Sequence, residues 1–202
     1  MNNELVNSCE KLIIASNNEH KVKELKQLLK PYFSEIISLK EAGCDIVPDE
    51  TGEMFYDNAL IKAKTVSDIL KVPVLADDSG LCVDALDGLP GVHSARYALT
   101  QNVGNIDDAN NDKLLQELKG IEDRIAYFES VVLIYFPDNK IIFGEGRVHG
   151  RILYEKKGSG GFGYDCLFYS DELHKTFAEA SAEEKNAISH RARAVKALIG
   201  KL

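Results

Sequence analysis

The stretch from Val74 to Ala98, VLADDSGLCVDALDGLPGVHSARYA, constrains this chain more than any other. It opens on the apolar run VLA, which is typical of a strand buried on both faces. Asp77 and Asp78 follow, and since successive side chains on a strand point to opposite faces, only one of them is expected to face a given cleft. Carboxylates at the end of a buried strand are placed where open α/β sheets bind ligands and divalent cations. Asp-Ser-Gly is equally ordinary turn chemistry, so a simple turn is the alternative.

The composition excludes some classes of function. A chain of 202 residues with 45% hydrophobic and 28% charged residues fits one large globular domain or two small ones and is long enough to bury a real core. Lysine and arginine total 24 against 32 acidic residues, a formal net charge of −8. Binding of nucleic acid along a diffuse basic surface is therefore not expected. An anionic small molecule can still bind where cations gather locally or a metal ion intervenes.

The cysteines and the hydropathy predict a cytoplasmic protein. The four cysteines, Cys9, Cys44, Cys82 and Cys166, are widely spaced, as expected of reduced, mostly buried thiols. The first residues, MNNELVNSCEK, are polar and lack the apolar core of a secretion signal. No apolar run approaches the length of a membrane span.

A strand, a polar turn and a helix are predicted near the amino terminus. Leu12 to Ala15 are predicted to form the strand, and residues 16–18 (SNN) the turn. The helix is predicted from the apolar residues that recur with helical spacing between Val22 and Leu29. Lys21 falls in the first helical turn. Free backbone N–H groups at such a helix start bind anions, and Lys21 would add a positive charge. A plain N-cap with a solvated lysine is the alternative.

Two acidic residues precede a second, longer helix, which is predicted over residues 52–71. Asp49 and Glu50 stand where carboxylates interact favourably with the helix dipole. They are also candidates for metal ligands that face Asp78. Lys62 lies on this helix and shares one of its faces with Asn58, four residues earlier.

Further elements complete an alternation of strands and helices. A strand is predicted over Glu35–Leu39, a helix over Asn105–Gly120, and a hairpin over 125–136 and 140–148. The glycines of the hairpin, Gly144, Gly146 and Gly150, are expected to mark bulges or twists of the strand.

The segment GSGGFG at residues 158–163 formally matches G-x-G-x-x-G. A dinucleotide fingerprint needs a helix after this loop, but residues 164–168 favour a strand. The segment is better interpreted as a loop that presents Phe162, Tyr164 and Asp165. Phe162 could lie flat against a planar ring, and Asp165 could accept from ring N–H groups. Core aromatic residues beside a turn are the alternative.

A capping box at Ser181 opens the last helical segment. Lys185 and Ser189 fall on one helix face, whereas His190 and Arg191 point away from it. If all four serve one ligand, the helix is expected to break near Ser189, which is a good N-cap. These cations suit phosphate or carbonyl oxygens, and a solvated basic helix end is the alternative.

Together the segments SNNEHK, ETGEMFYDNALIKA, LADDSGLCVDALDGLPGVHSARYA, GGFGYD and AEEKNAISHRARA resemble the inosine/xanthosine triphosphate pyrophosphatase family. The matches occur in family order over nearly the whole chain. The resemblance implies an α/β fold with an elongated mixed β-sheet flanked by helices, two lobes around a central cleft, and one pyrophosphatase domain over residues 1–202. It also implies a cytoplasmic homodimer that hydrolyses ITP, dITP and XTP to the monophosphate and pyrophosphate with Mg²⁺. No nucleic acid or membrane partner is implied.

The resemblance also implies roles for particular residues. Asp78 would accept the proton of the attacking water, and Asp78 and Glu50, with Asp49, would organise the metal. The phosphate-binding residues would be Ser16, Asn17, Asn18, Glu19, His20 and Lys21, with help from Lys62. Asp77 and Ser79 would lie beside Asp78, and Ser79 would contact the substrate. The purine base would be enclosed by Phe162, Gly163, Tyr164, Asp165, Lys185, Ser189, His190 and Arg191.

The chain departs from the family pattern at three positions. Asn17 stands where glycine is common, His93 replaces a tyrosine, and Cys166 replaces a proline. All the named charges are intact, so these departures bear on loop geometry and specificity. Two other functions remain open: a pyrophosphatase for modified pyrimidine nucleotides, and a module that binds nucleotides without turnover.

Overall fold

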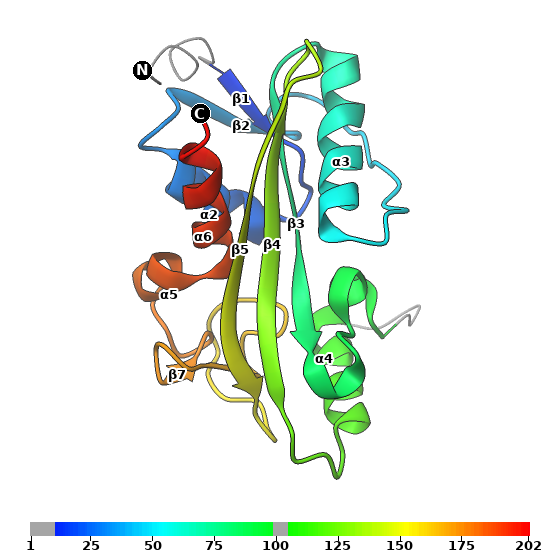
Figure 1. Cartoon of the computed structure of the whole chain (residues 1–202), viewed down its shortest axis with the longest axis vertical. Coiled ribbons are helices and arrows are strands. Elements are labelled where there is room, and N and C mark those ends of the chain that lie inside the picture. The colour runs from blue at the N-terminus through cyan, green and yellow to red at the C-terminus, as the bar shows by residue number, and fades with distance from the viewer. Residues whose placement is uncertain (1–10, 99–104) are drawn as a thin grey trace. The chain divides into compact units, whose positions relative to one another are not determined.

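The chain forms a mixed seven-stranded β-sheet flanked by helices, and the computed structural model describes residues 11–98 and 105–202 (Figure 1). The strand order is β2-β1-β3-β4-β5-β6-β7. The strands are β1 (Lys11–Ile14), β2 (Glu35–Ser38), β3 (Val74–Val83), β4 (Ile125–Tyr135), β5 (Ile141–Ile152), β6 (Phe168–Ser170) and β7 (Lys175–Thr176). β1 pairs in parallel with β2 and β3, whereas β6 pairs antiparallel with β5 and β7. The predicted α/β class with a mixed sheet is confirmed.

The helices lie close to the predicted positions. They are α2 (Glu19–Leu29), α3 (Phe55–Leu70), α4 (Ile106–Glu117), α5 (Ala182–Ile188) and α6 (His190–Ile199), with 3-10 turns at Asp84–Leu86 and Gly91–Arg96. Between α5 and α6, Ser189 is extended with ψ 156°, and its N–H donates to the carbonyl of Lys185. The expected break of the helix near Ser189 is therefore confirmed.

Two local predictions are wrong. β3 does not stop at the two aspartates but continues through Ser79 and Gly80 to Val83, so the stretch is a strand and not a turn. Residues 164–167 form a turn instead of a strand, and the next strand begins only at Phe168. The N–H groups of Leu167 and Phe168 both donate to the carbonyl of Tyr164, and this closes the turn.

The chain divides into two compact units. Unit 1 comprises the described residues up to Asp78, with Ser130–Gly146 and Arg191–Leu202. Unit 2 comprises the described parts of Ser79–Glu129, with Arg147–His190.

In unit 1, helices cover both faces of the strands. Figure 1 shows α2 and α6 on one side of the strands and α3 on the other. The core on the side of α2 and α6 joins residues of both helices to four strands; it includes Leu12, Ile14, Leu25, Leu29, Leu75, Val132, Ile134, Ile142, Ala194, Val195 and Leu198. Burial of these apolar side chains is the main stabilising contribution to the unit.

In unit 2, the core joins α4 to strands and to the turn after residue 160. Its members include Leu81, Val83, Tyr97, Leu114, Leu118, Phe128, Val148, Tyr164, Leu167, Phe168 and Phe177. Phe128 packs edge-on against Phe168 at 4.8 Å between ring centroids, and parallel to Phe177 at 5.9 Å. These ring contacts stabilise the core beside the turn, because aromatic pairs in such geometries attract each other.

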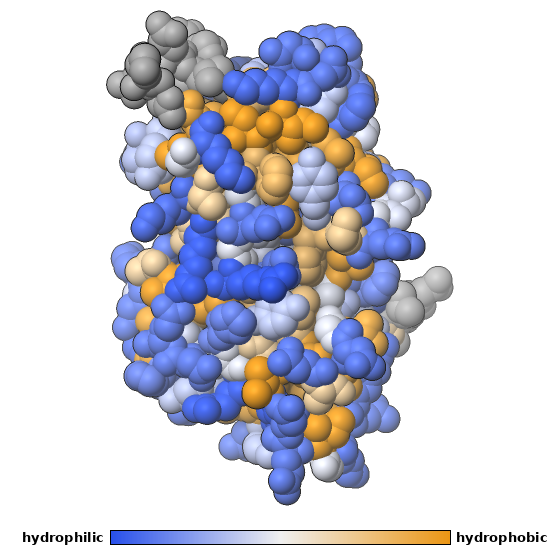
Figure 2. All heavy atoms as spheres, viewed as in Figure 1, coloured by the Kyte–Doolittle hydropathy of each residue, from blue (hydrophilic) through white to orange (hydrophobic). Residues whose placement is uncertain are grey.

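Hydrophilic side chains predominate on the face seen in Figure 2, and hydrophobic ones gather mainly in the upper part of the view. None of the helices described is both long enough and apolar enough to cross a bilayer. Cys44 and Cys82 are buried and Cys166 is partly buried, all as free thiols. Cys9 and the polar amino-terminal residues lie outside the described residues.

Gly144 lets β5 approach α6 closely. A Cβ atom at this position would lie 2.2 Å from the carbonyl oxygen of Ala194 and 2.4 Å from the backbone nitrogen of Leu198. Backbone atoms of a helix move only with the helix, so a methyl group would force the two elements apart. A Cβ atom at Gly150 would likewise lie 2.2 Å from the carbonyl oxygen of Tyr169. Both glycines therefore serve packing.

We expect Gly144→Ala to lower the free energy of unfolding by about 1–3 kcal/mol, which is the usual effect of overpacking. Urea denaturation followed by circular dichroism measures the change. Glu145→Ala, at the exposed neighbouring position of β5, is the matched control and should stay near the wild type. Equal stability of the two variants would contradict the close approach of β5 to α6.

Candidate active site

The turn between β1 and α2 in unit 1 has the geometry predicted for an anion site. Asn18 is the N-cap of α2 and accepts from the N–H of Lys21 at 3.1 Å. The hydroxyl of Ser16 accepts from the N–H of Asn18 at 3.2 Å. Free N–H groups at a helix start attract negative charge, so the turn is suited to phosphate oxygens. Of the other residues predicted to bind phosphate, Asn17 in the turn and Glu19 and His20 at the start of α2 are exposed.

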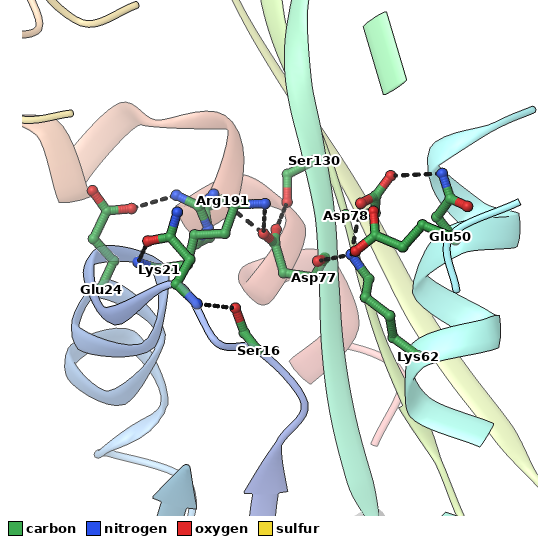
Figure 3. Close-up of polar contacts among 11 residues, drawn as sticks. Ser16, Lys21, Glu24, Glu50, Lys62, Asp77, Asp78, Ser130 and Arg191 are labelled. Atoms are coloured by element: carbon green, nitrogen blue, oxygen red, sulfur yellow. Dashed lines mark hydrogen bonds and ion pairs between the residues drawn. The ribbon is translucent and has the colours of Figure 1, made fainter. Parts of the chain in front are cut away.

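Asp77 holds two cations on the side of β3 that faces α2 and α6 (Figure 3). Its carboxylate lies 3.0 Å from Lys21 Nζ and 3.2 Å from an Arg191 guanidinium nitrogen, and accepts from the Ser130 hydroxyl at 2.6 Å. Arg191 also pairs with Glu24. Burial alone would raise the pKa of Asp77, but Arg191, Lys21 and Ser130 hold it well below its ordinary value.

Asp78 faces the opposite side of β3, toward α3, as the alternation of side chains along a strand requires (Figure 3). Lys62 Nζ donates to its carboxylate at 2.6 Å and to the carbonyl of Asp77 at 2.9 Å, and the Asn58 amide donates at 3.4 Å. Burial raises the pKa of Asp78, although the charge of Lys62 opposes this shift. The two adjacent aspartates therefore have opposite pKa shifts.

Glu50 joins this cluster through Lys62, whose Nζ lies 3.3 Å from its carboxylate. Burial would lower the pKa of Lys62, but the charges of Asp78 and Glu50 raise it above its ordinary value. The carboxylates of Glu50 and Asp78 therefore both pair with the ammonium group of Lys62.

The donor set suits Mg²⁺. Within residues 11–98 and 105–202, no group of three or more His, Cys, Asp or Glu side chains is placed to hold a metal ion. Mg²⁺ typically takes one or two carboxylates and completes its shell with water and substrate phosphates. Glu50 and Asp78 supply such a pair of hard oxygen donors, whereas Asp49 is exposed.

The residues predicted to enclose the purine base lie mainly in unit 2. Asp165 accepts from Lys185 Nζ at 2.6 Å and from the N–H of Phe162 at 2.9 Å. Lys185 Nζ also lies 4.7 Å from the centre of the Phe162 ring. The hydroxyl of Tyr164 donates to the carbonyl of Ser94 at 2.9 Å. The loop predicted to receive a planar ring is therefore tied into the unit on both sides of Phe162.

The remaining predicted residues divide between the units. Ser189 and His190 are buried in unit 2, where the His190 ring stacks on Phe128 with 4.8 Å between centroids. Arg191 belongs to unit 1 and is buried against Asp77 and Glu24. Ser79, predicted beside Asp78, is partly buried.

Four residues of these networks were not singled out from the sequence. Glu24 and Ser130 orient Arg191 and Asp77, but they are far from both along the chain and carry no local signal. Asp107 and Asn111 bind the backbone of Gly163. Their spacing of four places them on one helix face, which was the available signal.

The comparisons with known proteins identify the family. The profile of the Ham1 family matches residues 12–201. The dITP/XTP pyrophosphatase of Clostridium perfringens is 48% identical over 196 residues, which cover 93% of this chain and 95% of that protein. The dITP/XTP pyrophosphatase of Treponema denticola is 44% identical over 185 residues, covering 92% and 94%.

Solved structures show the same fold. The Ham1 protein of Staphylococcus aureus superposes with a TM-score of 0.82 at 40% identity, covering 95% of this chain and 97% of that one. A dITP/XTP pyrophosphatase from Mycobacterium abscessus gives 0.74 at 41% identity, covering 94% and 98%. The resemblance found in the sequence motifs is confirmed, and this chain belongs to the Ham1 family.

Proposed function

We propose that this protein hydrolyses the non-canonical purine nucleoside triphosphates ITP, dITP and XTP to the monophosphate and pyrophosphate, with Mg²⁺ as cofactor. The observation that carries the proposal is the pair of aspartates on β3. Asp77 holds Lys21 and Arg191 on one side of the strand, and Asp78 meets Lys62 and Glu50 on the other. The relatives named above as dITP/XTP pyrophosphatases support the same activity.

The phosphate chain is the part of the substrate that unit 1 would bind. A chain of net charge −8 can attract a triphosphate only through local cations. Lys21 supplies one beside the N–H groups at the start of α2, Lys62 supplies another on the opposite side of β3, and Mg²⁺ would add more positive charge. Asp77 keeps the Lys21 ammonium at the start of this helix, so the cation is in place before the substrate arrives.

Asp78 is the residue we assign as general base. It would accept the proton of the water that attacks the triphosphate, and the bond between the α- and β-phosphates would break to release pyrophosphate. A general base has to lie within hydrogen-bond reach of the water that it deprotonates, and Asp78 is the carboxylate on the α3 side of β3, beside Lys62. Glu50 and Asp78 would hold Mg²⁺, which neutralises charge on the triphosphate and on the departing pyrophosphate.

The purine ring is assigned to unit 2. Phe162 would stack on the ring, and Asp165, held by Lys185, would accept from a ring N–H. Hypoxanthine and xanthine carry an acceptor oxygen where adenine carries an amino donor. A buried donor such as His190 would be left unpaired by adenine, and rejection on this basis can reach about 10⁴-fold. Arg191 is assigned to the Asp77 network, because its guanidinium binds Asp77 and Glu24.

We further propose that the chain is a single pyrophosphatase domain with two lobes. It would act as a homodimer in the cytoplasm on the free nucleotide pool. The family resemblance supports each of these points.

One pyrophosphate-release assay with ITP, XTP, dUTP, ATP and GTP tests the proposal. We expect kcat/KM for ITP and XTP to exceed that for ATP and GTP by at least about 100-fold. Chelation of Mg²⁺ should abolish turnover. Preference for dUTP would instead indicate a pyrimidine nucleotide pyrophosphatase. Tight ITP binding without pyrophosphate release, even in excess Mg²⁺, would indicate a binding module.

A further inference from the structure

Helix α4 holds both backbone groups of one residue in the loop assigned to the purine ring. The N–H of Gly163 donates to the Asp107 carboxylate at 2.7 Å. The carbonyl of Gly163 accepts from the Asn111 side-chain amide at 2.9 Å. Asp107 and Asn111 are one helical turn apart, so side chains from one face of α4 form hydrogen bonds with both peptide groups that flank Gly163.

These two hydrogen bonds act at one of the three glycines in residues 158–163 that have a positive φ. Gly163 has φ +61°, in the left-handed region that glycine adopts most easily. Asn111 is 2% exposed, so water competes little for its bond to the Gly163 carbonyl. The helix start is itself fixed, since the Asn105 side chain accepts from the N–H of Asp107 at 3.0 Å.

The two neighbours of Gly163 carry the groups that would meet the ring. Phe162 precedes it, and its N–H is bound to Asp165. Tyr164 follows it, with its hydroxyl tied to Ser94. Rotation of either peptide plane at Gly163 would move the Phe162 ring relative to Asp165. The α4 contacts therefore hold the backbone between the stacking surface and the polar acceptor, which hydrogen bonds between Phe162 and Asp165 also join directly.

We propose that Asp107 and Asn111 are positioning residues for purine recognition, and that they act through Gly163 on Phe162 and Asp165. The inference rests on the function proposed above and deepens it, because it assigns part of the base preference to a helix not singled out by the sequence motifs. Neither residue is assigned a contact with the substrate.

The test compares Asp107→Ala and Asn111→Leu with Asp107→Asn in steady-state kinetics on ITP. We expect the first two to raise KM by about tenfold, the effect of losing one hydrogen bond to a loop held in place, with kcat within about twofold. Asp107→Asn keeps an oxygen that can accept from Gly163, and should restore KM to near the wild-type value. Asp108→Ala is the matched control, because Asp108 lies on the same turn of α4 and pairs with Lys156 instead.

A double-mutant cycle shows whether Asp107 acts through the loop. If it does, Asp107→Ala adds little to the KM of Phe162→Ala, whereas independent effects multiply. The chain has no tryptophan, so Phe162→Trp places a single tryptophan at the loop, and the response of its fluorescence to IMP should shrink when Asp107→Ala is added.

The outcomes separate the two proposals. A wild-type protein without ITP hydrolysis would remove the proposed function itself. An active wild type whose Asp107→Ala and Asn111→Leu variants match Asp108→Ala in KM would overturn only the role of α4. A loss of kcat with unchanged KM, or multiplicative effects in the cycle, would overturn it as well.

Discussion

Replacing Asp78 with asparagine is expected to lower kcat for ITP hydrolysis by about 10²–10⁴-fold, the usual contribution of a general base. Asparagine keeps the shape of the side chain and an oxygen for Lys62, but it has no basic carboxylate to accept a proton. The substitution would also remove one of the two proposed carboxylate ligands of Mg²⁺. Pyrophosphate release under saturating ITP and Mg²⁺ measures the effect.

The same substitution should leave the fold intact. Asparagine has nearly the shape of aspartate and keeps an oxygen that can accept from Lys62 Nζ. Lys62 keeps the Asp77 carbonyl and Glu50 as partners. Asp68→Asn on α3, which removes an exposed carboxylate paired with Lys64, is the control for kcat. Normal turnover by Asp78→Asn would show that another group is the base.

Much of the site could be predicted because its signals are local. The alternation of side chains along a strand is enough to send Asp77 and Asp78 to opposite faces. The turn after β1 follows from an apolar run and an Asn N-cap. The break at Ser189 follows from two signals. Serine is a strong N-cap, and the four candidate binding residues from Lys185 to Arg191 would not share one face of an unbroken helix.

The rest depends on distant partners that no local pattern reveals. β3 continues beyond the aspartates to Val83 as a strand of the sheet, although Asp-Ser-Gly favours a turn. The aromatic run after Gly163 has strand propensity, but the turn closed on the Tyr164 carbonyl prevails because it packs those rings into the unit 2 core. Arg191 and Glu24 are 167 residues apart in the sequence, and only the packing of α6 beside α2 brings them together.

Asp77→Asn is expected to have the opposite consequence from Asp78→Asn, with a large loss of stability. The Asp77 carboxylate is the buried counter-ion of Arg191, which is 1% exposed. Removing one partner of a buried ion pair leaves the other charge poorly compensated, at a typical cost of about 3–5 kcal/mol. For a chain of this length that corresponds to a fall in Tm of roughly 10 °C. Thermal unfolding followed by circular dichroism at pH 7 measures it.

The pH dependence separates this explanation from a general packing defect. Because the pKa of folded Asp77 lies well below its ordinary value of 3.8, its ionised form stabilises the fold above about pH 4. This contribution is lost as the pH falls through the lowered pKa. The difference in stability between wild type and Asp77→Asn should therefore persist from pH 7 to about pH 4 and shrink below it. A difference that stays constant into strong acid would assign the loss to packing, and Asp78→Asn, adjacent on the same strand, is the matched control that should show little difference at pH 7.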